Sequence, residues 1–177
     1  SLIDNKFSVV GVITSPDRPK GRGKKMTMSE VKEAALKNNL PVFQPEKIKK
    51  QTSIDQLKLW KPDLIVVAAY GQIISKNILD LPKYGCINVH ASLLPKYRGA
   101  SPIHYALLNG EKETGITIMK MDEGMDTGEI ISNFQFLISN DDNLISLYSR
   151  LANLGAKLLV KTIPDYIAGK IKLKKQD

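Results

Sequence analysis

The chain has 177 residues, a hydrophobic content of 42% and a formal net charge of +8. A chain of this length can bury one core and is too short for two domains of ordinary size. It contains no apolar run near the roughly 20 residues that span a bilayer. Its first residues lack the basic-then-apolar layout of a secretion signal, but the chain does not begin with methionine, so a natural start upstream and a lost targeting segment stay open. The single cysteine, Cys86, excludes an intrachain disulfide framework and fits a reducing compartment.

The positive charge is concentrated in two segments. Basic residues occur at positions 18, 20, 22, 24 and 25, and again at 170, 172, 174 and 175. Such clusters suit a polyanionic partner such as nucleic acid, although a solvated basic face has the same composition. Composition alone leaves both interpretations open.

The first half of the chain alternates short apolar runs with helix-forming segments. The predicted elements are strands at residues 7–13, 42–43 and 64–69, and helices at residues 29–38, 53–60 and 75–81. Ser29 is the predicted N-cap of the first helix. Residues 16–25 alternate proline, glycine and basic side chains, which predicts an exposed, mobile loop without a complete nucleotide-binding motif.

The second half changes this rhythm. A strand at residues 85–89 and a helix at 101–109 are followed by strands at 115–121 and 129–138. The last two strands are joined by a short loop and should pair antiparallel. Leucines at three- and four-residue steps then predict an amphipathic helix from residue 143 to about residue 163, capped by Asp141 or Asp142.

This order of elements predicts an α/β fold. We expect a three-layer, Rossmann-like domain whose sheet is mostly parallel, with a late antiparallel addition. Doubly wound folds usually open with a strand and helix at the centre of the sheet, whereas the pattern of this chain begins at what would be the second strand. We therefore expect that the first βα unit is missing.

The chemistry is expected where polar residues follow the strand at residues 85–89. Asn88 and His90 are two positions apart and should project on the same side of that strand. Asp126 lies in a later loop between Gly124 and Gly128, which allow a tight turn. An imidazole beside a carboxylate and an amide donor suits acyl transfer, because the amide can stabilise an oxygen that gains negative charge.

Two versions of this chemistry compete. Ser92 or Cys86 could be a nucleophile served by His90, or the nucleophile could belong to the substrate. The second version is favoured, since neither side chain is expected at a sharp, exposed turn. The histidines and the cysteine show no metal-ligand spacing, so no metal site is predicted.

Three segments carry a resemblance to a known family. They are the run from Asn88 to Ile103, the run from Glu113 to Met119 and the run from Met121 to Gly128. Together they resemble the formyltransferases that use 10-formyltetrahydrofolate. The basic segment at residues 16–25 is similar to an insertion found in family members that act on charged initiator tRNA, and the similarity spans essentially the whole chain.

The resemblance implies that Asn88, His90 and Asp126 are the catalytic residues. The amino group of methionine on initiator tRNA would attack the formyl carbon of 10-formyltetrahydrofolate. Asn88 and protonated His90 would stabilise the oxygen of the resulting intermediate, while His90 would also handle protons and Asp126 would hold the imidazole and order water.

The resemblance also implies binding residues for both substrates. The expected folate contacts are Ser92, Leu93, Leu94, Pro95, Tyr70, Gly71, Gln72 and Ile73, with the loop at residues 122–126 lining the pterin pocket. The expected tRNA contacts are Arg18, Arg22, Lys24 and Lys25. No metal is implied, and the protein is expected to be a monomer in a bacterial cytoplasm or an organelle matrix.

The resemblance predicts the domain limits as well. Residues 1–168 are expected to form the catalytic domain, truncated at its N-terminus, and residues 169–177 to begin a linker to a C-terminal domain. Hydrolysis of the formyl folate, or transfer to a small amine or sugar nucleotide, is the alternative reaction. A non-enzymatic RNA-binding module is a further alternative, which would need the basic loop without the three catalytic residues.

Overall fold

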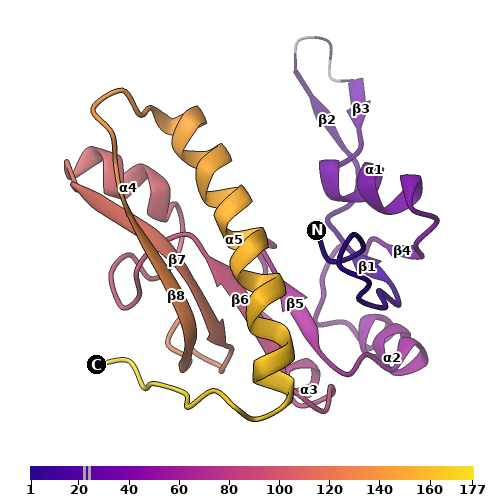
Figure 1. Ribbon diagram of the computed structural model, residues 1–177. Coiled ribbons are helices and arrows are strands. Elements are labelled where there is room, and N and C mark those ends of the chain that lie inside the picture. The colour runs from indigo at the N-terminus through magenta and orange to yellow at the C-terminus, as the bar shows by residue number, and fades with distance from the viewer. Residues whose placement is uncertain (22, 24) are drawn as a thin grey trace.

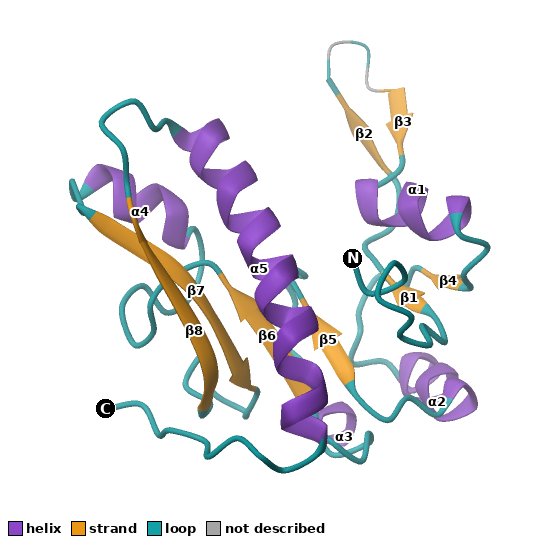
Figure 2. Cartoon of the chain, viewed as in Figure 1, coloured by secondary structure: helices purple, strands orange, loops and turns teal. Residues whose placement is uncertain are grey.

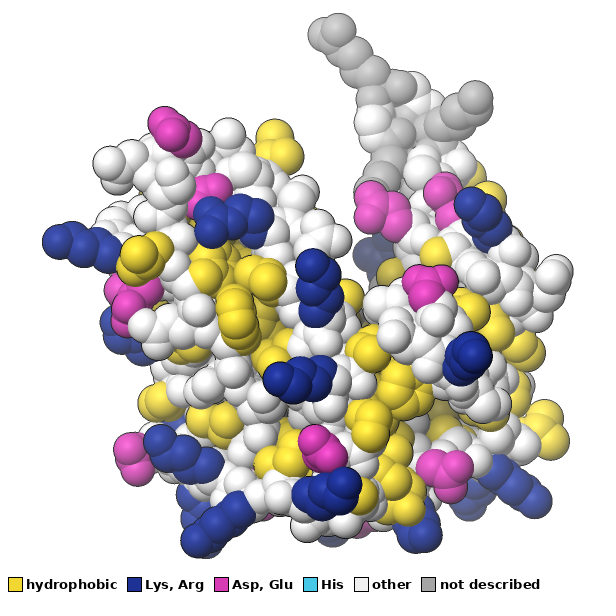
Figure 3. Space-filling model, viewed as in Figure 1, with side chains coloured by type: hydrophobic (Ala, Val, Ile, Leu, Met, Phe, Trp, Pro, Cys, Tyr) yellow, Lys and Arg dark blue, Asp and Glu magenta, His cyan; other side chains and the backbone are white. Residues whose placement is uncertain are grey.

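The computed structural model describes every residue except 22 and 24, and for residues 20 and 25 it describes the backbone only. Its elements form a main body, in which a sheet is crossed by one long helix, and a smaller lobe that carries a projecting hairpin (Figures 1 and 2). The surface is hollowed between the upper parts of these two lobes (Figure 3). Among the described residues, no helix is both long and apolar enough to cross a membrane.

The main sheet has four strands in the order β5 (Ile65–Val67), β6 (Cys86–His90), β7 (Glu113–Lys120) and β8 (Ile130–Leu137). The first pair is parallel, and the pairs β6–β7 and β7–β8 are antiparallel. The late antiparallel addition is therefore confirmed. The β7–β8 pair is antiparallel because the short segment between these two strands leaves no room for a crossover helix.

The smaller lobe contains a second parallel pair, formed by β1 (Val12–Ile13) and β4 (Val42–Phe43). Helices α1 (Glu30–Lys37) and α2 (Gln51–Trp60) accompany it. Ser29 caps α1 by accepting a hydrogen bond from the backbone of residue 32 at 3.1 Å, which confirms the predicted cap. The strand predicted at residues 7–13 is shorter than expected, because its partner offers only two residues to pair with.

The basic segment is not the loop that its composition predicted. It forms a hairpin of β2 (Arg18–Lys20) and β3 (Lys25–Thr27), with Pro19 opposite Met26. Proline is tolerated here because the strand lies at an edge. Asp17 fixes the base of the hairpin, accepting hydrogen bonds from Lys32 at 2.6 Å and Gln44 at 2.8 Å. These bonds hold the pKa of Asp17 below its usual value, Lys32 being the larger influence.

Helix α5 (Leu144–Ile167) covers one face of the main sheet (Figure 1). Its buried residues include Leu147, Leu151, Leu159 and Ile163. Of the predicted leucines, those at positions 147 and 151 are buried, those at 154 and 158 are half-buried and that at 144 is exposed. At Gly155 a Cβ atom would lie 3.1 Å from Val89, so the glycine lets this helix approach β6 closely. The other face is covered by α2 and α3 (Lys76–Leu79), which pack against Cys86, and the three-layer arrangement is confirmed.

The predicted cap of α5 is corrected by the structure. Asn143, rather than Asp141 or Asp142, accepts hydrogen bonds from the backbone of Ile145 at 2.9 Å and Ser146 at 3.1 Å. Asp142 instead accepts from the backbone of Ser139 at 2.9 Å and pairs with the guanidinium of Arg150. Asp142 thus has partners before it, at Ser139, and after it, at Arg150, so the preference of aspartate for a cap position did not predict its role.

Candidate active site

The two faces of strand β6 carry different side chains, apolar ones on the core side and polar ones at the candidate site. Ile87 and Val89 point toward α5 and pack in its hydrophobic clusters. Asn88 and His90 alternate with them and therefore face the opposite side of the sheet. The two polar side chains are buried, with relative exposures of 9% and 6%.

The loop that follows β7 returns across this same face. Its start is held where the backbone of Met121 donates to the carbonyl of Cys86 at 2.8 Å. At Gly128 a Cβ atom would collide with the carbonyl oxygen of Lys120, so only glycine permits the close return. Asp126 has a φ of 53°, in the left-handed region that Asp and Asn tolerate better than most residues. The loop thus delivers a carboxylate onto β6.

The carboxylate of Asp126 joins three parts of the chain. One oxygen accepts a hydrogen bond from Asn88 Nδ2 at 3.2 Å, and the other accepts from the backbone N–H of Gly99 at 2.9 Å. This second oxygen also lies 3.5 Å from His90 Nδ1. The structure therefore brings Asn88, His90 and Asp126 together in one cluster, although 38 residues separate the first from the last.

The ring of His90 is oriented from both sides. Its Nε2 lies 2.8 Å from the carbonyl oxygen of Tyr97, which can only accept, so this nitrogen carries a proton. In the neutral ring, Nδ1 is then the unprotonated nitrogen, directed toward the Asp126 carboxylate. A proton taken up at Nδ1 would meet that carboxylate, which would stabilise the charged ring.

The cluster keeps further hydrogen-bonding capacity. Asn88 Oδ1 is buried and has no hydrogen-bond partner among the described residues, and Asn88 Nδ2 has a second hydrogen besides the one directed at Asp126. The amide of Asn88 can thus donate to a substrate oxygen, beside an imidazole whose Nδ1 can accept a proton. Such groups, fixed before reaction in a site largely shielded from water, are what acyl transfer requires.

The two candidate protein nucleophiles are not placed for attack. The hydroxyl of Ser92 is fully buried and donates to the carbonyl of Lys96 at 2.6 Å. The thiol of Cys86 is buried against α3, 3.7 Å from the carbonyl of Ile78. Burial raises the pKa of this thiol to about 12, so it remains protonated at neutral pH. The geometry supports a nucleophile that belongs to the substrate.

The state of Cys86 leads to a direct prediction. At pH 8, four units below its pKa of about 12, about one thiol in 10,000 is ionised. Iodoacetamide should therefore leave the folded protein unmodified, whereas the denatured chain should be alkylated completely. Mass spectrometry of the two samples measures this difference. Alkylation of the folded protein at the rate of the denatured chain would contradict the buried position of the thiol.

The run at residues 92–95 is built into the core. The backbone N–H of Leu94 donates to Thr117 Oγ1 at 3.1 Å, and that hydroxyl donates to the carbonyl of Ser92 at 2.7 Å. Leu94 is buried, Leu93 is half-buried and Pro95 is exposed. Sequence reasoning missed Thr117, although a polar residue between Ile116 and Ile118 in a buried strand was an available signal.

The loop after β5 leaves the sheet beside the cluster, because Val67 pairs with Asn88. In this loop Tyr70 is half-buried and its hydroxyl has no hydrogen-bond partner among the described residues, while burial raises its pKa. Gln72 accepts from the backbone of Ile48 at 2.9 Å. Ile73 is 80% exposed, so its side chain is accessible to a ligand.

The predicted tRNA contacts lie on the hairpin of the smaller lobe. Arg18 is exposed on β2. Arg22 and Lys24 lie outside the described residues, and of Lys25 only the backbone, in β3, is described. The hairpin projects away from the main body (Figure 1).

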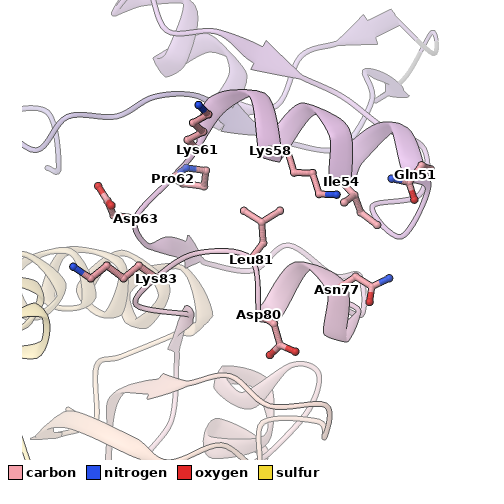
Figure 4. Close-up of a pocket in the computed structure, with 10 residues that line it drawn as sticks. All are labelled: Gln51, Ile54, Lys58, Lys61, Pro62, Asp63, Asn77, Asp80, Leu81 and Lys83. Carbon is pink, nitrogen blue, oxygen red and sulfur yellow. The ribbon is translucent and has the colours of Figure 1, made fainter.

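A second surface feature is distinct from the cluster. A hollow of about 690 Å³ lies between α2 and α3, with Lys58, Asp63 and Asp80 among its lining residues (Figure 4). It is at the amino ends of β5 and β6, away from the cluster of Asn88, His90 and Asp126, and its charges are mixed in sign. Within the described part of the chain, no group of three or more His, Cys, Asp or Glu residues is placed to hold a metal ion.

The fold and the cluster of Asn88, His90 and Asp126 together define an α/β protein whose site suits acyl transfer to a nucleophile that belongs to the substrate. Comparison with protein families makes this specific, since residues 2–163 match the family described as formyl transferase. The chain belongs to the formyl transferase family.

Individual relatives are similar along the whole chain. The methionyl-tRNA formyltransferase of Bacillus subtilis is 54% identical over 177 residues, which are 100% of this chain and 56% of the relative. That of Clostridium acetobutylicum is 56% identical over 176 residues, 99% of this chain and 56% of the relative. The chain spans about half the length of the curated relatives it matches.

A solved structure shows the same fold. It is the formyltransferase PseJ from Anoxybacillus kamchatkensis, in complex with UDP-4,6-dideoxy-4-formamido-L-AltNAc and tetrahydrofolate. The TM-score is 0.67 at 27% identity, and the alignment covers 93% of this chain and 80% of that one.

Proposed function

We propose that this chain carries the catalytic site of an enzyme that transfers a formyl group from 10-formyltetrahydrofolate to the amino group of methionine on initiator tRNA. The observation that carries the proposal is the cluster of Asn88, His90 and Asp126 in a formyl transferase fold. The identity of 54% to the Bacillus subtilis methionyl-tRNA formyltransferase over the whole chain supports the choice of amine. Residues 1–168 would form the catalytic domain.

The formyl folate supplies an activated formyl carbon when bound. Asn88 would donate its second Nδ2 hydrogen to the formyl oxygen, because the first is held by Asp126. The unpartnered Oδ1 of Asn88 is an acceptor and would be available to a donor on the substrate. The unpaired hydroxyl of Tyr70 and the exposed Ile73 fit a flat, partly polar ring beside it.

His90 would move the proton that the attacking amine must lose. With Nε2 bonded to the carbonyl of Tyr97, Nδ1 is the nitrogen that can accept it. The carboxylate of Asp126, 3.5 Å away, would stabilise the charged ring. The positive charge of the ring would help to stabilise the oxygen that gains negative charge, to which Asn88 donates a hydrogen bond. The ring would then return its proton to the folate nitrogen, which leaves as its bond to the formyl carbon breaks.

The remaining roles follow from position and charge. Residues 92–95 would support the folate mainly through their backbone, since Ser92 and Leu94 are turned into the core. The hairpin would hold the tRNA through Arg18, Arg22, Lys24 and Lys25. We place the enzyme in the bacterial cytoplasm, as a monomer that binds both substrates at once.

The proposal is tested by measuring formyl transfer from 10-formyltetrahydrofolate to charged initiator tRNA. Formylated tRNA is the expected product. Folate cleavage without formylated tRNA would indicate a hydrolase instead. Transfer to glycinamide ribonucleotide or a sugar nucleotide in place of tRNA would assign the same cluster to another amine, and the absence of any folate turnover would leave RNA binding as the remaining function.

The basic hairpin provides a separate prediction. Arg22→Ala should raise the Michaelis constant for charged tRNA by roughly threefold to tenfold and reduce its dependence on salt, because one phosphate contact is lost. The Michaelis constant for the folate should not change. Lys58→Ala removes a lysine from α2, far from the hairpin, and is the matched control. Equal losses of affinity for tRNA and folate would contradict the assignment.

A further inference from the structure

The segment that follows α5 reaches the catalytic loop from the other side of the sheet. Ile171 and Leu173 pack in the cluster beneath α5. Lys174 then forms a bridge to Ile130 at the start of β8, with N···O distances of 2.7 and 2.9 Å in the two directions. The segment thus passes around the open edge of the sheet, and its end lies beside β7 and β8 (Figure 1).

Gln176 contacts the loop that carries Asp126. Its Nε2 donates to the carbonyl of Asp126 at 3.0 Å and to the carbonyl of Gly128 at 2.6 Å. Its Oε1 accepts from Arg98 Nε at 3.0 Å. Both donors and the acceptor of this one side chain are therefore used, and Gln176 is half-buried between the exposed Lys175 and Asp177.

These contacts connect the loop that carries Asp126 with the segment at residues 98–99, which binds the Asp126 carboxylate. Arg98 precedes Gly99, whose N–H donates to Asp126 Oδ2 at 2.9 Å. Gln176 fixes Asp126 at its backbone carbonyl, while Gly99 fixes it at its carboxylate. The backbone at Asp126 has a φ of 53°, so its conformation depends on outside contacts of this kind.

We propose that Gln176 is a positioning residue for formyl transfer. It acts through the backbone of the loop that carries Asp126 and keeps the carboxylate in contact with Asn88 and His90. The proposal rests on the proposed function for its activity measurement, but the contact itself can be tested independently. A displacement of about 1 Å at a catalytic group can cost about 100-fold in rate.

Three variants of the intact protein separate the two links that Gln176 makes. Gln176→Leu keeps the size and removes every hydrogen bond. Gln176→Glu keeps an acceptor for Arg98 but directs a carboxylate at two carbonyl oxygens. Arg98→Met breaks the link to residues 97–99, together with the bond that Arg98 donates to the carbonyl of Asp177 at 3.1 Å, and leaves the bonds of Gln176 to the loop in place. Gln51→Leu, the same change on the exposed surface of α2, is the matched control.

We expect Gln176→Leu to lower kcat for formyl transfer by about 10-fold to 100-fold, with both Michaelis constants changed by less than about twofold. Gln176→Glu should lose at least as much, and Arg98→Met less than either. A merely structural role would instead lower the melting temperature without this division between kcat and the Michaelis constants. Gln51→Leu should match the parent protein.

Amide hydrogen exchange gives the readout that needs no activity. Residues 122–128 should exchange faster in Gln176→Leu than in the parent, while β6 and α5 remain as protected as before. Unchanged exchange in this loop, or an unchanged kcat in an active parent, would overturn the inference. A parent without formyl transfer would refute the proposed function, and the exchange comparison would still decide whether Gln176 holds the loop.

Discussion

His90→Ala should lower kcat for formyl transfer by about 100-fold to 10,000-fold, the range that acid–base assistance contributes. The loss is large because the ring performs two tasks. We propose that it accepts the proton of the amine at Nδ1, and that its positive charge then helps to stabilise the oxygen that gains negative charge. Single-turnover measurement of formylated tRNA tests this, with both substrates saturating.

The other histidine of the chain is the matched control for this experiment. His104 is exposed on α4 (Pro102–Leu108), and His104→Ala should retain the rate of the parent. The melting temperature of His90→Ala should be measured as well, since its ring is bonded to the carbonyl of Tyr97. A folded His90→Ala protein with a rate close to that of the parent would remove the imidazole from the mechanism.

Asp126→Asn should reduce kcat by between about 100-fold and about 10,000-fold, the upper figure being the cost of the same change in the serine protease triad. Asparagine is nearly the same size and tolerates a positive φ, so the loop should keep its conformation. The substitution removes the charge that stabilises the protonated ring of His90. The Michaelis constants should change little, because both carboxylate oxygens of Asp126 are engaged by Asn88, His90 and Gly99.

The matched control for this variant is Asp141→Asn, an exposed carboxylate in the turn before α5. It should behave like the parent in rate and stability. If Asp126→Asn kept most of the rate while Asn88→Ala and His90→Ala lost theirs, the carboxylate would have only a structural role, in holding Gly99 and Asn88.

Elements specified by local signals were predictable from the sequence. Ser29 caps α1, and the apolar run of β6 forms a buried strand. The leucine pattern of α5 faces the sheet. Each signal acts over a few residues, through a cap hydrogen bond or through the period of side chains along a helix or strand, and needs no knowledge of the rest of the chain.

Elements that depend on a partner outside the local sequence signal were mispredicted. The hairpin of β2 and β3 requires pairing across a turn rich in glycine and basic residues, and composition favoured a loop. The length of β1 is limited by the two residues of β4. The cap of α5 is Asn143 because Arg150 and Ser139 engage Asp142. In each case tertiary context decided between local alternatives.

The candidate site shows the same division. The sequence by itself determined that Asn88 and His90 share one face of a strand, because side chains alternate along β6. Only the tertiary structure brought Asp126 to them, and it alone identified the backbone of Tyr97 and Gly99, the hydroxyl of Thr117 and the amide of Gln176 as their supports. Backbone groups carry no side-chain signature, and contacts across the sheet do not depend on spacing along the chain, so these partners could be recognised only after folding.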